Sequence, residues 1–169
     1  MKIGIISDTH ITKGVPHFIN LLDTYFKEAD IIIHAGDYIN IEVVEALKNY
    51  KNFVGVWGNV DDDNIRKALN EKEIITLKDY KIGIFHGHGI KNTTIDRAYE
   101  KFSEDNVDII IFGHSHHPFI KTKNSILMLN PGSLTSKRRE RWFSYIMLEL
   151  RHDNISAELK LINVKSSNN

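Results

Sequence analysis

The feature that most constrains the fold of this chain is a series of short apolar runs that each stop at glycine, histidine or aspartate. The runs contain mainly isoleucine, valine and phenylalanine, and each is short enough to be a strand buried on both faces. We therefore expect five buried strands with polar residues at their carboxyl ends. The strands are predicted at residues 3–6, 31–33, 53–57, 82–85 and 109–112.

The segments between these runs favour helices, whereas the last part of the chain does not. Apolar residues or a helix-start pattern predict helices at residues 18–26, 43–47, 61–69 and 94–102. Strands that alternate with helices indicate a layered α/β fold. Four strand-like runs then follow without long helices between them, at residues 119–122, 126–129, 143–148 and 155–162. We expect these runs to form an antiparallel region, packed as a second layer on the first.

Size and charge place the chain among ordinary single domains. We expect one domain over residues 1–165 and a frayed tail over residues 166–169. The 22 basic residues balance the 22 acidic residues, so no overall field attracts nucleic acid or an anionic membrane. The opening apolar run is too short for a signal peptide, and no run approaches the roughly 20 apolar residues of a membrane span. The default expectation is a cytoplasmic protein without membrane attachment, and a homo-oligomer is left open.

The polar residues that end the five runs form a set of metal ligands. The carboxyl ends of strands in open α/β sheets line one crevice, so these side chains are expected to converge. The chain has no cysteine, and a metal would therefore be held by nitrogen and oxygen atoms alone. The set comprises Asp8, His10, Asp37, Asn59, His86, His114 and His116.

This ligand set suits a pair of divalent transition metal ions. Two cations that lie close together repel one another, so an anionic group must bridge them. A carboxylate such as Asp37 can bridge because it has two oxygens, whereas an imidazole cannot. Mixed nitrogen and oxygen ligands favour manganese, iron, zinc, nickel or cobalt over magnesium or calcium, and manganese is the expected ion.

The same residues resemble the ordered sequence blocks of the calcineurin-like metallophosphoesterase superfamily. The blocks are Asp8-Thr9-His10, Gly36-Asp37, Gly58-Asn59, His86-Gly87-His88 and Gly113-His114-Ser115-His116. The small size and the segment Asn130-Pro131-Gly132-Ser133 resemble the small prokaryotic phosphodiesterase branch of that superfamily. The resemblance implies a two-sheet sandwich flanked by helices, in four layers of the order α/β/β/α.

The resemblance also implies a metal arrangement and a reaction. The first metal would be held by Asp8, His10, Asp37 and His116, and the second by Asp37, Asn59, His86 and His114. The implied activity is hydrolysis of a small phosphate ester, most simply a phosphodiester, by water or hydroxide bound between the two ions.

One position departs from the pattern of the superfamily. Many members follow the Gly-Asn pair with a histidine that protonates the leaving group, but this chain has Val60, which cannot transfer a proton. Asp61 and His88 are the candidate catalytic residues in its place, His117 is a weaker candidate, and metal-bound water is a further alternative.

Two other classes of function remain open at this stage. A protein-interaction scaffold of the same fold is one alternative, although such a scaffold needs no complete ligand set. A nuclease is the other, and the balanced charge argues against it. Of the remaining histidines, His34 ends an apolar run and is expected to be a hydrogen-bonded core residue.

Overall fold

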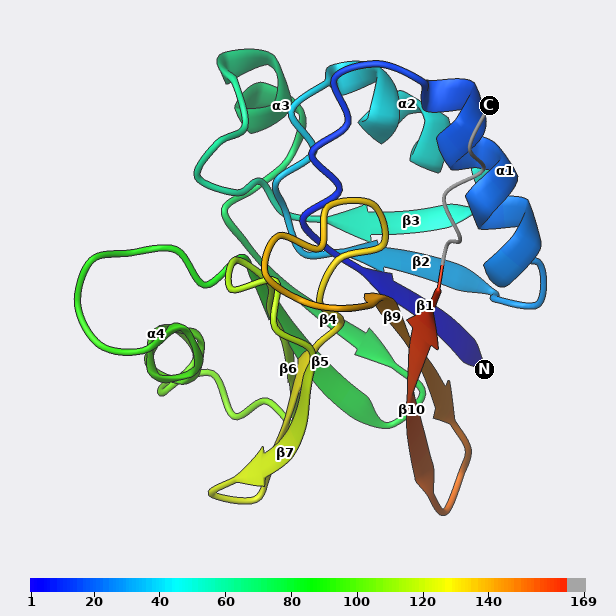
Figure 1. The fold of residues 1–169 in the computed structure, drawn as a ribbon. Coiled ribbons are helices and arrows are strands. Elements are labelled where there is room, and N and C mark those ends of the chain that lie inside the picture. The colour runs from blue at the N-terminus through cyan, green and yellow to red at the C-terminus, as the bar shows by residue number, and fades with distance from the viewer. Residues whose placement is uncertain (164–169) are drawn as a thin grey trace.

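Two five-stranded sheets packed face to face form the centre of the molecule (Figure 1). The computed structural model describes residues 1–163, so the tail predicted at residues 166–169 and the last two residues of the predicted domain lie outside the described residues. The first sheet has the strand order β10-β9-β1-β2-β3 and the second has the order β4-β5-β6-β8-β7.

The strands of each sheet come from both halves of the chain. The first sheet contains β1 (Lys2–Ile6), β2 (Ile31–His34), β3 (Asn52–Gly55), β9 (Phe143–Leu150) and β10 (Ile155–Ile162). The second contains β4 (Lys72–Leu77), β5 (Tyr80–Phe85), β6 (Ile109–Ile111), β7 (Phe119–Lys123) and β8 (Ile126–Asn130). The centre of each sheet is parallel, namely β1-β2-β3 in the first and β5-β6-β8 in the second. The carboxyl ends of these central strands therefore lie together at one edge of each sheet.

Within residues 1–163, four helices cover the outer faces of the sandwich. The first sheet is covered by α1 (Val15–Tyr25), α2 (Ile41–Tyr50) and α3 (Asp63–Ala68), and the second by α4 (Thr94–Lys101). In Figure 1, α1 and α2 lie together beside the strands of the first sheet, and α4 lies apart on the other side. This arrangement confirms the four-layer α/β/β/α sandwich that the resemblance implied. No helix in the described part of the chain is long and apolar enough to cross a membrane.

The central strands β1, β2 and β6 are continuous apolar runs because both of their faces are buried, whereas β3 at the sheet edge is only partly buried. One face of each sheet contributes to the core between the sheets, where Ile3, Ile33, Ile84 and Ile111 are fully buried. The opposite faces pack under the helices, as Ile32 does in the cluster that contains α1 and α2. Short strands buried on both faces were predicted from the sequence on this pattern.

One expectation about the sheets was wrong, and one strand was missed. The last four strands do not form a separate layer, because β9 pairs with β1 in the first sheet whereas β8 pairs with β6 in the second. The strand β4 was not predicted at all. Most of its residues are half-buried at the edge of the second sheet, and among the described residues it pairs only with β5, through a tight turn in which Lys78 has φ 56°.

Candidate metal centre

Seven polar side chains meet where loops from both sheets come together. Each loop follows the carboxyl end of a parallel strand, and the two sheets contribute through facing edges rather than as five neighbouring strands. Asp8 and His10 follow β1, Asp37 follows β2, Asn59 follows β3, His86 follows β5, and His114 and His116 follow β6.

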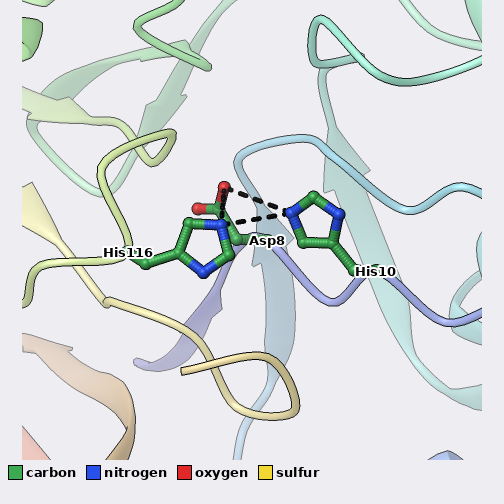
Figure 2. Close-up of side chains that lie close together, drawn as sticks. All are labelled: Asp8, His10 and His116. Atoms are coloured by element: carbon green, nitrogen blue, oxygen red, sulfur yellow. Dashed lines mark hydrogen bonds and ion pairs between the residues drawn. The ribbon is translucent and has the colours of Figure 1, made fainter. Parts of the chain in front are cut away.

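Asp8, His10 and His116 form the first cluster of ligand atoms (Figure 2). The Asp8 Oδ1 atom lies 3.2 Å from His116 Nε2 and 3.9 Å from His10 Nε2. The two imidazole Nε2 atoms lie 3.1 Å apart, although the residues are far apart in the sequence. Three ligand atoms therefore surround one small volume, as a bound cation requires.

Asp8, Asp37 and His86 form the second cluster, which is buried. His86 Nε2 lies 3.2 Å from Asp37 Oδ2 and 4.0 Å from Asp8 Oδ1. The same Asp37 oxygen lies 3.5 Å from His10 Nε2 of the first cluster. One oxygen of Asp37 thus stands between the imidazoles of the two clusters, and Asp8 belongs to both clusters.

Asn59 and His114 lie beside the second cluster. The Asn59 Oδ1 and His114 Nδ1 atoms are 2.9 Å apart, and the ring centroids of His114 and His86 are 5.2 Å apart. The structure therefore brings all seven side chains of the set into one neighbourhood.

Local backbone conformation and hydrogen bonds aim these side chains. Five residues of the set have φ values between 47° and 68°, a region that is uncommon for residues other than glycine. The residues are Asp8, His10, Asp37, His114 and His116. The His86 Nδ1–H group donates to the carbonyl of Ala35 at 2.7 Å, and His116 Nδ1 similarly meets the carbonyl of Ser136, so both rings present Nε2 to the clusters.

Two glycines in the blocks allow loops to approach the carboxylates closely. A Cβ atom at Gly58 would overlap the carboxylate of Asp37, and one at Gly113 would overlap Ser7 and crowd the carboxylate of Asp8. The glycines of the Gly58-Asn59 and Gly113-His114 pairs are therefore required because a side chain would not fit at these positions.

Two buried ligand atoms have no hydrogen-bond partner among residues 1–163. They are Asp8 Oδ1 and His86 Nε2, and both point into the clusters. Buried polar atoms in folded proteins nearly always have a partner, because an unpaired one costs about 1–3 kcal/mol. A divalent cation with nitrogen and oxygen ligands would satisfy both atoms, so the residues present fit a metal.

The carboxylates are held in the ionised form that binds metal. Burial raises the pKa of Asp37, but the His86 imidazole 3.2 Å away and the hydrogen bond from Val60 N outweigh burial and hold the pKa at about 2. Burial also acts to raise the pKa of Asp8, and the neighbouring histidines lower it overall. Both side chains are therefore anionic at neutral pH.

The histidine side chains of the site differ in the direction of their pKa shifts. Burial lowers the pKa of His114 to about 4 and lowers the pKa of His116, so these two rings are neutral at pH 7. Burial also acts to lower the pKa of His86, but Asp37 and Asp8 raise it overall. A proton on His86 therefore competes with a cation for the same nitrogen as the pH falls.

His34 lies next to the site but is part of the core. Its ring is fully buried and stacks on Tyr38 with the centroids 3.8 Å apart. The Gly36 N–H group donates to Nδ1 at 3.0 Å, and Nε2–H donates to Thr9 Oγ1 at 3.1 Å. Every polar atom of this ring is satisfied in the neutral form, as expected from the sequence.

Because His34 is buried as a neutral ring, we expect it to make stability depend on pH. Burial lowers its pKa from 6.5 to about 3, so the unfolded chain binds the extra proton and stability is lost as the pH falls below 6.5. Between pH 7.5 and pH 5 this group alone should lower the free energy of unfolding by about 2 kcal/mol. Urea denaturation of chelator-treated protein should show a smaller loss over this range in His34→Asn. Equal losses in the two proteins would contradict the assignment.

Asp61 lies behind the site, where its carboxylate accepts hydrogen bonds from four backbone N–H groups. Its Oδ2 atom accepts from Asp37 N at 2.9 Å and Gly58 N at 2.7 Å, and its Oδ1 atom accepts from Tyr38 N at 2.7 Å and Ile39 N at 2.9 Å. The side chain is buried, and burial raises its pKa although these hydrogen bonds oppose the change. The Asp61 side chain thus links the loop that carries Asp37 to the loop that carries Asn59. The sequence alone did not predict this role.

His88 lies beside the second cluster and His117 lies on the surface. The His88 ring stands 5.8 Å from the His86 ring, stacks on Trp57, and places Nε2 at 3.2 Å from Glu71 Oε1. His117 is largely exposed and contacts Glu140 at 2.8 Å. Of these two rings, His88 is the one held next to the ligands.

Sequence reasoning missed the residues that fasten the segment after β8 to the site. Ser133 Oγ donates to the carbonyl of Asp8 at 2.7 Å, and Thr135 Oγ1 donates to the carbonyl of Thr9 at 2.5 Å. Asn130 Nδ2 donates to the carbonyl of Gly113 at 2.9 Å. The Asn-Pro-Gly-Ser segment is the one sequence feature that points to this region. In the sequence it supports only the resemblance to the family and does not predict these contacts.

Comparisons with known proteins agree with this geometry. A probable metallophosphoesterase of Methanocaldococcus jannaschii is 39% identical over 140 residues, which cover 82% of this chain and 70% of that protein. A phosphodiesterase of the same organism is 29% identical over 145 residues, which cover 78% of this chain and 83% of that protein. The crystal structure of a Vps29 variant from Entamoeba histolytica superposes with a TM-score of 0.74 at 24% identity, covering 96% of this chain and all of that one, and this likeness concerns the fold alone.

The family profile extends over nearly the whole described chain. The calcineurin-like phosphoesterase superfamily domain matches residues 1–153, which include all seven ligand residues and every strand except β10. The chain belongs to the calcineurin-like phosphoesterase superfamily.

Proposed function

We propose that this protein is a phosphodiesterase that hydrolyses small phosphate esters with two divalent transition metal ions. The observation that carries the proposal is the position of Asp37 Oδ2, which stands between His10 Nε2 at 3.5 Å and His86 Nε2 at 3.2 Å. A phosphodiesterase among the relatives supports the choice of a diester substrate.

The ligands divide between two ions that share Asp37. Asp8, His10, Asp37 and His116 would hold one ion, and Asp37, Asn59, His86 and His114 would hold the other. When bound, two such ions acidify a water molecule and offset the charge that develops on the phosphoryl oxygens. We propose manganese as the ion, with iron, zinc, nickel and cobalt as alternatives that the same nitrogen and oxygen atoms accept.

Two other residues near the site would position the ligand loops and supply a proton to the leaving group. Asp61 fixes the loops that carry Asp37 and Asn59 through four backbone hydrogen bonds. Because Val60 cannot transfer a proton, we propose that His88 supplies the proton that the leaving group needs. Its Nε2 atom lies 3.2 Å from Glu71 Oε1. Burial lowers the pKa of His88, and the Glu71 carboxylate acts against this change and favours a proton on the ring.

A metal titration tests the proposed activity. Metal-free protein should not hydrolyse bis(p-nitrophenyl) phosphate, and the rate should rise with added manganese and saturate near two equivalents. In the same assay, His88→Gln should slow the hydrolysis of an alkyl ester more than that of the nitrophenyl ester, since only the alkoxide needs a proton.

The other outcomes of this titration distinguish the alternatives. Absence of turnover with every divalent ion would support an interaction scaffold of the same fold. Degradation of single-stranded nucleic acid at a higher rate than the small diester would support a nuclease. Saturation at one equivalent would contradict the shared role of Asp37.

A further inference from the structure

The outer strand β10 leaves one side of the first sheet without a partner strand in the described part of the chain (Figure 1). It is eight residues long, and within the sheet it pairs only with β9. The edge strand β7 of the other sheet is shorter and carries Lys121 and Lys123, which discourage pairing with another strand. β10 carries a single lysine, and no proline interrupts it.

The register of the β9–β10 hairpin fixes which backbone groups of β10 face outward. Arg151 N donates to the carbonyl of Asn154 at the end of the hairpin, and Ile155 then pairs with Leu150. Hydrogen-bonded and non-hydrogen-bonded pairs alternate along an antiparallel ladder. The N–H and C=O groups of residues 155, 157, 159 and 161 therefore turn away from β9, toward the open edge.

The side chains of this edge are apolar on one face and charged on the other. Leu159 is 36% exposed and Leu161 is 54% exposed, which places them among the few large apolar side chains that residues 1–163 expose. On the opposite face, Glu158 and Lys160 are exposed and form an ion pair with each other. Exposed leucines beside unpaired backbone groups are typical of a strand that pairs across an interface.

The order of residues along β10 makes the strand complementary to itself. An antiparallel copy related by a twofold axis at Leu159 places Glu158 opposite Lys160 of the second copy, and Lys160 opposite its Glu158. Leu159 then meets its own copy and Leu161 meets Ala157, all on the apolar face. The outward backbone groups of residues 157, 159 and 161 coincide in this register and form about six hydrogen bonds.

Neighbouring registers lack this match. A twofold axis at Glu158 places two glutamates opposite each other, and an axis at Lys160 places two lysines opposite each other. Like charges directly opposite destabilise a strand pair. The charges therefore select the register centred on Leu159.

From these features we propose that a second copy of this chain binds at the β10 edge, so that the first sheets of two protomers join into one continuous sheet. The interface is isologous, as in most dimers, and each protomer contributes the same strand. The metal centre takes no part in it, because the ligand residues follow β1, β2, β3, β5 and β6.

Charge exchange between two variants tests this pairing. Glu158→Lys places two lysine pairs in the interface and Lys160→Glu places two glutamate pairs there, so each variant alone should dimerise about tenfold more weakly than the wild type. An equimolar mixture of the two variants restores opposite charges at every pair and should recover the dimer. Sedimentation velocity of the full chain over a range of micromolar concentrations measures all three samples.

Two further variants test whether the backbone edge of β10, and not another exposed apolar surface, forms the interface. Leu159→Pro removes an outward N–H group but no hydrogen bond to β9, so it should abolish the dimer while circular dichroism remains that of the wild type. Ile90→Lys, which replaces a 99% exposed apolar side chain elsewhere, should leave the dimer unchanged. A wild-type chain that stays monomeric throughout the range, a mixture that fails to recover, or a Leu159→Pro dimer would each overturn the proposal.

Discussion

Replacing Asp37 with asparagine should lower kcat/KM for a phosphodiester by at least about 10²–10³-fold, the range seen when one preorganised electrostatic group is removed. The reason lies in the two oxygens of this side chain. Oδ1 accepts from Val60 N at 3.2 Å, and an asparagine oxygen can keep that bond. The amide group then replaces Oδ2, which stands between His10 and His86, by an uncharged donor that cannot bridge two cations.

The same variant should bind metal with a changed stoichiometry. Asp37 has a pKa of about 2, so the wild-type side chain is fully anionic at the pH of the assay and the substitution removes a whole charge. Isothermal titration with manganese should detect two ions in the wild type and fewer in Asp37→Asn.

The matched control for this variant is Asp62→Asn. Asp62 caps α3 through Oδ1, and asparagine caps a helix equally well, so neither stability nor activity should change. Near-wild-type turnover in Asp37→Asn, together with binding of two ions, would rule out a bridging role.

The sequence allowed the site to be predicted more completely than the sheets. Asp8, Asp37 and His86 each lie within three residues of the end of a strand, and the carboxyl ends of parallel strands meet at one edge whatever the order of the strands. The apolar pattern that predicts a strand does not indicate which other strand it pairs with. β9 and β8 have similar apolar patterns, yet one pairs with β1 and the other with β6.

Two other features could not be predicted from the local sequence pattern. The strand β4 begins with Lys72 and Glu73 and is only half-buried, so it lacks the continuous apolar run that marks the central strands. The role of Asp61 depends on backbone groups of residues 37–39, more than twenty residues earlier in the chain. Its position after Gly58-Asn59 indicated proximity to the site, but only the folded loops define what its carboxylate binds.

Replacing Asp61 with alanine should destabilise the fold by about 3–5 kcal/mol, more than a typical substitution, because it leaves several buried N–H groups without an acceptor. The side chain is 3% exposed, and its two oxygens accept from Asp37, Tyr38, Ile39 and Gly58. Asp61→Asn should also be destabilising, because its amide nitrogen would face two of these N–H donors. Urea denaturation in the presence of chelator measures the fold apart from any bound metal.

The loss should extend from stability to metal affinity, because the same four hydrogen bonds fix the loops that carry Asp37 and Asn59. Well below the melting temperature, Asp61→Asn should bind manganese about 10–100-fold more weakly, as substitutions behind metal ligands generally do. Asp63→Asn, in the first turn of α3, is the matched control and should change neither quantity by much. If Asp61→Asn retained wild-type stability and affinity, the loops would have to be held by other contacts. If it retained both but lost turnover, Asp61 would instead act directly on the substrate, as a catalytic residue in the place that Val60 cannot fill.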